Sequence, residues 1–259
     1  MDQRERNSLG MITQEYIVSQ DVAKRRDYMT TQIYRKTPEI KRFPPETGRP
    51  AMKIFNLDLV LMEKSQGVGY VDQARHTLEL LRRIELIDNC DLLIDGTGVG
   101  EAVVDIYREL GMRPIPIIFT SGDLCRPVYS ESSGTGLAGS GWGKMAALRT
   151  LKEMRVPKED LVHAGSIILQ QKRMRIAPQL DHLEDFRKQL AGFRGKINEK
   201  TGNLKYENAT DDLHDDLVCT YLMAAWWATY SRVTEQEEQI KSKRDVKGYD
   251  PMDYVLDDR

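Results

Sequence analysis

The stretch "LLIDGTGVGEAVVDIY" (Leu92–Tyr107) constrains the fold more than any other part of this sequence. A short apolar run ends in Asp95, a glycine-broken turn follows, and residues 102–110 have the spacing of a helix. The next apolar run, "RPIPIIF", is typical of a second buried strand. Because a strand–helix–strand order usually places two parallel strands in one sheet, these residues predict the parallel half of an α/β fold.

The segment before this unit predicts a three-stranded antiparallel meander. "EYIVSQDVAKRRDYMTTQIYRK" is typical of two strands joined by a tight charged turn at residues 24–27. A proline-rich loop over 38–50 and a third alternating strand over 51–64 follow. The meander followed by parallel strands indicates a three-layer α/β arrangement around a mixed sheet.

Further elements are predicted from helical spacing and from turn residues. Residues 71–86 form a helix with Asp72 as its cap, and residues 158–173, 181–193 and 214–231 form three more helices, the last very apolar. Residues 120–150, rich in glycine and serine, are expected to form a long loop. Residues 195–207 predict a β-hairpin that turns at Thr201–Asn203.

Composition limits the class of protein. With 259 residues, of which 40% are hydrophobic, the chain can bury one sizeable core, and a net charge of −2 gives no overall basic field for nucleic acid. The three cysteines lack CxxC spacing, and neither a signal segment nor a membrane span is recognisable. We therefore expect a soluble intracellular protein, with a tail over 1–15, one domain over 16–232 and a charged tail over 233–259.

Acidic residues interrupt apolar elements at three places. Asp21 lies late in the first strand, Asp95 ends a buried strand, and Asp215 and Asp216 precede the last helix. Burial of an unpaired carboxylate is unfavourable, and divalent cations relieve the repulsion between neighbouring carboxylates. Each acid also has an ordinary interpretation, because Asp95 suits a turn or cap, Asp215 or Asp216 a helix cap, and Asp21 a strand end near Lys24. The three together favour a site for Mg²⁺ or Mn²⁺.

Four segments together resemble the nuclease domain of the large terminase subunit of tailed bacteriophages: "IVSQDVAKRRDYMTTQIYR", "LLIDGTGVGEAVVDIYREL", "VPKEDLVHAGSIILQQKRMRIAP" and "HDDLVCTYLMAAWW". The similarity extends from about Tyr16 to Trp227. The resemblance implies an RNase H/RuvC-like, retroviral-integrase-type fold, with an antiparallel meander followed by parallel strands, flanking helices and an added β-hairpin.

The resemblance also implies the roles of individual residues. Two Mg²⁺ or Mn²⁺ ions would activate a water molecule and stabilise the leaving oxygen. Asp21 would bridge the two ions, and Asp95 and either Asp216 or Asp215 would complete their coordination shells. Asp216 is the preferred ligand, with Asp215 capping the helix or joining it. Asp27 and His214 match accessory positions near the metal ions.

Local basic residues are the expected contacts to the DNA backbone, which they would hold without reading sequence. They lie just after Asp21, at the end of the 158–173 helix and on the hairpin: Lys24, Arg25, Arg26, Lys172, Arg173, Arg194, Lys196 and Lys200.

The expected activity is endonucleolytic hydrolysis of double-stranded viral DNA, with little sequence specificity, during genome packaging in the cytoplasm of a bacterial host. The resemblance implies a terminase ATPase domain, a small terminase subunit and a portal as partners. Only about fifteen residues precede the first strand, where large terminases have an ATPase motor, so we expect an excised domain or a free-standing relative that does not translocate DNA. A RuvC-like junction resolvase and an actin-like or sugar-kinase-type ATPase are the alternatives.

Overall fold

The structure is a computed structural model that describes residues 15–23, 28–44, 47, 52–83, 85–98, 100–121, 124–130, 150–197, 204–208 and 214–230. Apart from Glu15, the predicted tails lie outside these residues, as do the 24–27 turn and the hairpin turn, and the domain boundaries stay predictions.

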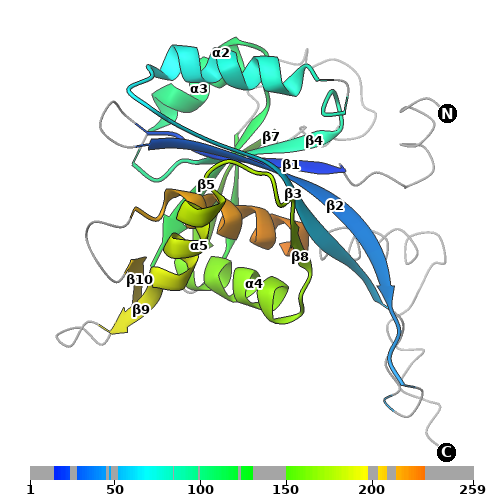
Figure 1. Cartoon of the computed structure of the whole chain (residues 1–259). Coiled ribbons are helices and arrows are strands. Elements are labelled where there is room, and N and C mark those ends of the chain that lie inside the picture. The colour runs from blue at the N-terminus through cyan, green and yellow to red at the C-terminus, as the bar shows by residue number, and fades with distance from the viewer. Residues whose placement is uncertain are drawn as a thin grey trace, which may run out of the picture.

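An eight-stranded mixed sheet forms the centre of the protein, in the order β6-β7-β5-β4-β1-β2-β3-β8 (Figure 1). The strands β1 (Tyr16–Asp21), β2 (Tyr28–Lys41) and β3 (Met52–Gln66) form an antiparallel meander. On the other side of β1, the strands β4 (Cys90–Asp95), β5 (Pro114–Thr120) and β7 (Thr150–Pro157) continue the sheet in parallel. This order and polarity confirm the predicted RNase H-like fold class.

Two short strands complete the edges of the sheet. The strand β6 (Arg126–Ser130) pairs antiparallel with β7, and β8 (Met174–Ile176) pairs parallel with β3. A separate antiparallel pair, β9 (Phe193–Ile197) and β10 (Leu204–Asn208), provides the two strands of the predicted hairpin.

Helices cover both faces of the sheet, which confirms the three layers (Figure 1). One face packs against α2 (Tyr70–Leu81) and α3 (Glu101–Glu109). The other packs against α4 (Lys158–Gln170), α5 (Leu183–Gly192) and a helix over residues 216–230. Alternation along β1 explains this division, because Ile17 belongs to the core under the second set of helices and Val18 to the core under the first.

The 216–230 helix is the most deeply buried helix of the described chain, with every residue from 217 to 228 buried. Its backbone is joined to β1 by the Ser19 hydroxyl, which donates to the Thr220 carbonyl at 2.8 Å. Against α4 the approach is close, because a Cβ at Gly165 would lie 2.4 Å from Leu222 Cδ2. These contacts fix the helix against β1 and α4.

Several local expectations were wrong. The loop expected from residue 38 starts later, because Pro38–Lys41 continue β2 opposite β3. The N-cap of α2 is Gly69, and Asp72 lies in the first turn instead. The expected 120–150 loop contains β6, and β7 was not predicted. A proline in β6 hides the strand pattern, yet it is tolerated in an edge strand, which needs fewer backbone donors.

Among the residues that the structure describes, no helix combines the length and the apolar character that crossing a membrane requires.

Candidate active site at one end of the sheet

Asp21 and Asp95 end two neighbouring parallel strands. The register of β1 and β4 runs from Tyr16 opposite Cys90 to Gln20 opposite Ile94, so the next pair is Asp21 with Asp95. Adjacent strands lie about 4.8 Å apart, and residues in register on parallel strands point to the same face. Their parity is that of Ser19, whose side chain reaches the 216–230 helix. The two carboxylates therefore start from adjacent positions on the face that this helix covers.

Asp215 brings a third acid to the same end of the sheet. The Asp215 carbonyl accepts the first hydrogen bond of the 216–230 helix from Cys219 N–H at 2.8 Å, so Asp215 occupies the capping position. Its carboxylate lies 3.5 Å from the ammonium group of Lys158, the first residue of α4. The charge of Asp215 also raises the pKa of Asp95. The helix-cap interpretation and the acid-site interpretation thus apply to the same residue.

The buried thiol of Cys219 lies within the electrostatic reach of all three acids. Burial is the main cause that raises the pKa of Cys219 well above its ordinary value. The charges of Asp215, Asp21 and Asp95 raise it further, whereas the charge of Lys158 lowers it. Three carboxylates from three separate parts of the sequence therefore act on one buried atom.

Asp95 is only 8% exposed, and its environment is balanced between opposing effects. Burial raises its pKa from 3.8 to about 6, while hydrogen bonds from Thr97 and the charge of Lys158 lower it and Asp215 raises it. The Thr97 N–H donates to Asp95 Oδ1 at 2.7 Å, and the Thr97 hydroxyl accepts from Phe119 N–H at 2.9 Å. Asp95 is thus the turn residue that the sequence allowed, and it is also part of the acidic group.

The turn after Asp95 depends on glycine. A Cβ at Gly96 would lie 2.5 Å from Ile118 Cδ1 on the neighbouring strand, and Gly96 N–H donates to the Ile117 carbonyl at 3.0 Å. Gly98 and Gly100 have φ values of 87° and 75°, which other residues adopt rarely. This backbone leads the chain sharply from β4 into α3 and leaves the Asp95 side chain at the end of its strand.

The donor set fits a hard divalent cation in its chemistry, since carboxylate oxygens are the ligands that Mg²⁺ and Mn²⁺ prefer. Asp95 also holds a charge that burial disfavours, which a cation would stabilise. Within the described part of the chain, however, no three histidine, cysteine, aspartate or glutamate side chains are arranged to ligate one ion. The acids are neighbours through their backbones and charges, and their side chains do not form a closed set of ligands.

Asp216 and His214 flank Asp215. The Asp216 carbonyl accepts hydrogen bonds from the Thr30 hydroxyl at 3.3 Å and from the Thr220 hydroxyl at 3.0 Å, which ties the helix start to β2. The exposed His214 ring packs edge-on against Tyr28, with ring centroids 5.6 Å apart. Asp27 lies outside the described residues.

The predicted basic residues separate into two groups. At the acidic end, the exposed Arg194 lies in β9 together with Lys196, and the neighbouring Phe193 ring lies 5.5 Å from Lys158 Nζ. Lys24, Arg25, Arg26 and Lys200 lie outside the described residues.

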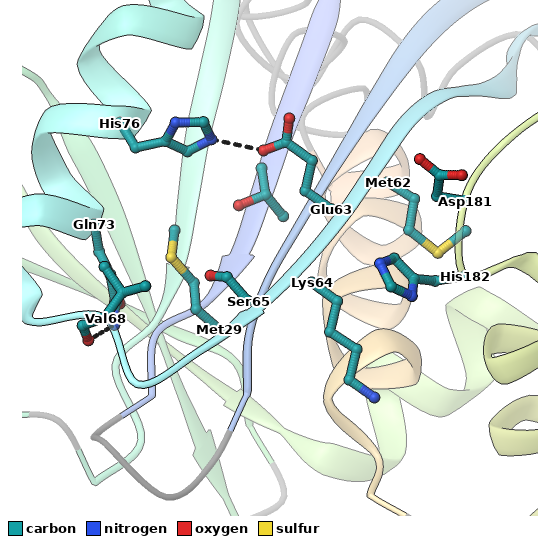
Figure 2. A pocket seen from close by; sticks show the side chains of 11 residues that line it. Met29, Met62, Glu63, Lys64, Ser65, Val68, Gln73, His76, Asp181 and His182 are labelled. Carbon is teal, nitrogen blue, oxygen red and sulfur yellow. Dashed lines mark hydrogen bonds and ion pairs between the residues drawn. The ribbon is translucent and has the colours of Figure 1, made fainter.

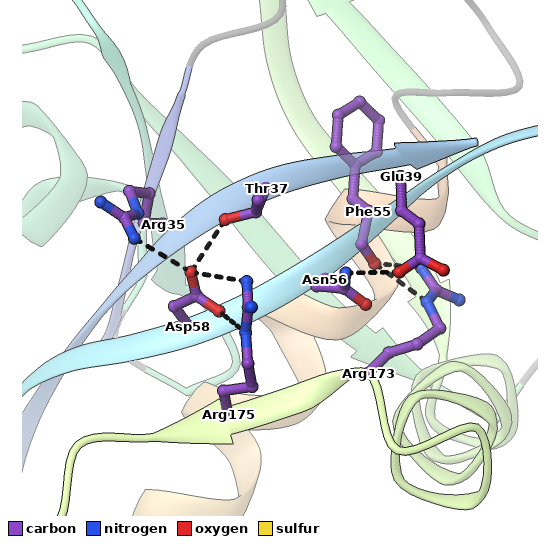
Figure 3. Close-up of polar contacts among 8 residues, drawn as sticks. All are labelled: Arg35, Thr37, Glu39, Phe55, Asn56, Asp58, Arg173 and Arg175. Carbon is purple, nitrogen blue, oxygen red and sulfur yellow. Dashed lines mark hydrogen bonds and ion pairs between the residues drawn. The ribbon is translucent and has the colours of Figure 1, made fainter. Parts of the chain in front are cut away.

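The second group lies at the opposite end of the sheet. The helix α4 begins at Lys158 beside the acids and runs for 13 residues, about 20 Å, before Lys172 (Figure 1). Arg173 is only 9% exposed, and its guanidinium donates to the Phe55 carbonyl (Figure 3). Its donors are therefore directed into the fold, and Arg173 is not retained as a DNA contact.

Sequence reasoning missed Lys158 and Thr97, which shape the charge at Asp95. Lys158 follows a proline at the start of a predicted helix, and nothing in its spacing relates it to acids elsewhere in the sequence. The Asp95-Gly96-Thr97 order is a weak signal for Thr97, because an aspartate in a turn often accepts from the N–H two residues later.

No protein-family model and no curated protein matches the chain. Among solved structures, it is similar to the large terminase nuclease of the thermophilic phage G20c, with 15% identity and a TM-score of 0.49 over 80% of this chain and 78% of that one. The same nuclease with bound zinc gives 14% identity and a TM-score of 0.42 over 82% and 80%. The terminase nuclease domain of human cytomegalovirus gives 10% and 0.43 over 91% and 98%.

Proposed function

We propose that this chain is a metal-dependent endonuclease that hydrolyses the backbone of double-stranded DNA with little sequence specificity. We further propose that it does so as the nuclease domain of a large terminase subunit, cutting viral DNA during packaging. The main support is the group of acids around Cys219. Asp21 and Asp95 end adjacent parallel strands of an RNase H-like sheet, and Asp215 directly precedes the 216–230 helix. The terminase motifs of the sequence agree with this geometry.

Asp21, Asp95 and Asp215 are the proposed metal-binding carboxylates, with Asp216 as a neighbour. The sequence alone favoured Asp216, but the influence of Asp215 on the pKa values of Asp95 and Cys219 supports Asp215 as the third carboxylate. Two bound Mg²⁺ or Mn²⁺ ions would supply an activated water and stabilisation of the leaving oxygen.

The protein's own residues prepare this site electrostatically. Thr97 holds the Asp95 carboxylate through one oxygen, so its orientation is set before any ion arrives. Lys158 offsets part of the negative charge through Asp215. Burial of Asp95 also limits competition from water, which strengthens its interaction with a cation.

The DNA backbone is proposed to lie across the acidic end of the sheet. Arg194 of β9 is the described candidate for a phosphate contact, and Lys24, Arg25, Arg26, Lys196 and Lys200 remain predictions from the sequence. His214 and Asp27 remain proposed accessory residues. An ATPase domain, a small terminase subunit and a portal are proposed partners.

Plasmid cleavage tests the proposal. Supercoiled DNA incubated with the protein should be nicked and then linearised in Mn²⁺ or Mg²⁺ and stay intact in EDTA. Asp21→Ala and Asp95→Asn should each reduce the rate by more than about 100-fold, because the loss of a residue that merely orients a ligand already costs 10–100-fold. Asp105→Asn is a matched control, since Asp105 pairs with Arg108 on the exposed side of α3.

Three results would contradict this function. Metal-independent cleavage would exclude the proposed chemistry. ATP hydrolysis without DNA damage would favour the actin-like or sugar-kinase class. Cleavage confined to four-way junctions, with linear duplex untouched, would favour a junction resolvase.

A further inference from the structure

Two glutamine side chains are buried in helices on opposite faces of the sheet. Gln73 of α2 is 2% exposed and Gln189 of α5 is 3% exposed. The buried face of a helix is normally apolar, so a polar side chain there needs hydrogen-bond partners. Both glutamines bond to the backbone two residues after a proposed metal-binding acid.

Gln73 holds the chain just beyond Asp21. Its Nε2 donates to the Ala23 carbonyl at 2.9 Å and to the Val68 carbonyl at 2.7 Å, and Figure 2 shows the side chain directed from α2 toward Val68. Ala23 lies two residues past the end of β1, where the sheet no longer supplies backbone partners. The Gln73 amide therefore replaces the sheet as the support of this segment.

The same helix also holds the chain just before Asp21. One turn after Gln73, the Thr77 hydroxyl accepts from Gln20 Nε2 at 2.9 Å, and Thr31 of β2 accepts from the same amide at 2.9 Å. The two residues that flank the end of β1 are thus tied to α2.

Gln189 supports the backbone near Asp215 in the same way. Its Oε1 accepts a hydrogen bond from Leu217 N–H at 3.0 Å. The first amides of a helix have no partner within the helix, and Leu217 is fully buried, so water does not reach it. The bond from α5 therefore satisfies this amide and fixes the helix start two residues after Asp215.

We propose that Gln73 and Gln189 are positioning residues, which fix the backbone near Asp21 and Asp215 and thereby set the affinity of the acidic group for a divalent cation. The inference rests on the proposed nuclease function. Like-charged carboxylates repel one another. Asp21 ends β1 and Asp215 directly precedes the 216–230 helix, so each lies where the chain leaves or enters regular structure. Ligand positions must be held within roughly 0.5 Å, so supports outside the ligands decide affinity.

Substitution by methionine isolates this role, because Gln73→Met and Gln189→Met keep the length of the side chain and remove its hydrogen bonds. The control is Tyr34→Phe, which removes a buried hydrogen bond to Gln32 Oε1 of 2.6 Å. Tyr34 is paired with Ile17, four residues and about 13 Å from Asp21 along β1.

The readout is Mn²⁺ affinity measured by calorimetry on the metal-free protein, alongside urea unfolding in EDTA. Each methionine variant should bind Mn²⁺ about 10-fold more weakly. Tyr34→Phe should stay within about twofold of the wild type, although it too loses a buried hydrogen bond. If either methionine variant fails to fold, Gln73→Asn or Gln189→Asn, which lose reach and keep polarity, should show the same weakening.

The outcomes separate the two proposals. A wild type that binds Mn²⁺ and cuts DNA, with glutamine variants that bind Mn²⁺ as tightly, would overturn the positioning role and leave the nuclease function intact. Equal weakening in Tyr34→Phe would also overturn it, because the effect would then be general loosening. A wild type that neither binds Mn²⁺ nor cuts DNA would overturn both.

Discussion

Two aspartates of this protein expose the same small fraction of their surface and have opposite electrostatic properties. Asp58 of β3 and Asp95 of β4 are each 8% exposed. Burial raises the pKa of both, but at Asp58 the hydrogen bonds from Arg175, Thr37 and Arg35 outweigh burial and lower it. At Asp95 burial prevails, and the pKa rises to about 6.

Asp95 lies deeper in the protein, and the two sites also differ in the partners that the chain supplies. Around Asp58, Arg175 donates at 3.0 Å, Thr37 at 2.8 Å and Arg35 at 3.4 Å (Figure 3). Around Asp95, a lysine is opposed by the like charge of Asp215. The first aspartate is part of the fold's own stabilisation, whereas the second holds charge that an external cation would balance. Burial of an acid therefore indicates function only when its partners are known.

Removal of each carboxylate should separate these roles most strongly. Asp58→Ala should lower the free energy of unfolding by roughly 2–3 kcal/mol, because it removes the acceptor of Arg175, Thr37 and Arg35, although the two exposed guanidiniums regain water. Asp95→Asn, which keeps an oxygen for Thr97, should leave the metal-free protein as stable or more stable. Urea unfolding in EDTA measures both, and a larger loss in Asp95→Asn than in Asp58→Ala would break the comparison.

The pH dependence of stability should differ in sign at the two sites. Between about pH 4 and 6 the folded protein keeps a proton on Asp95 that the unfolded chain releases, so this residue lowers stability by about 2–3 kcal/mol as the pH rises through that range. Asp58 contributes stability that is present above its unfolded pKa and is lost as the pH falls. Urea unfolding of the metal-free protein at pH 4 to 7 measures this.

The control for the pH effect is Asp95→Asn, in which the fall in stability between pH 4 and 6 should be smaller by that amount. Identical pH profiles for the wild type and this variant would show that Asp95 has an ordinary pKa.

The smallest expected effect concerns DNA binding, which should depend on a basic residue at the acidic end of the sheet and not on one at the opposite end. Arg194→Ala should weaken binding to duplex DNA a few-fold and reduce the slope of log affinity against log salt by about 0.9, the value for one phosphate contact. Lys172→Ala, an exposed residue at the far end of α4, should change neither. Fluorescence anisotropy in EDTA at several salt concentrations measures both, and equal effects would contradict the proposed path of DNA.

The sequence by itself determined the three layers around a mixed sheet, the positions of the acids along the chain and most of the elements. Local patterns suffice for these, because the alternation in the meander, the Asp95 turn and the apolar run after Asp216 each depend on neighbouring residues. The same patterns missed β6 and β7, where a proline obscures the strand and the pairing partner is remote.

Only the tertiary structure decided which charges act on which acid. Lys158 reaches Asp215, Arg175 reaches Asp58, and Gln189 reaches Leu217 across separations of 57, 117 and 28 residues. No local periodicity encodes such contacts, because they arise where the sheet and two helix layers bring distant segments together. The sequence thus specified where the acids are. Packing specified which acids are paired with arginine, which lack such a partner and which have their backbone held in place.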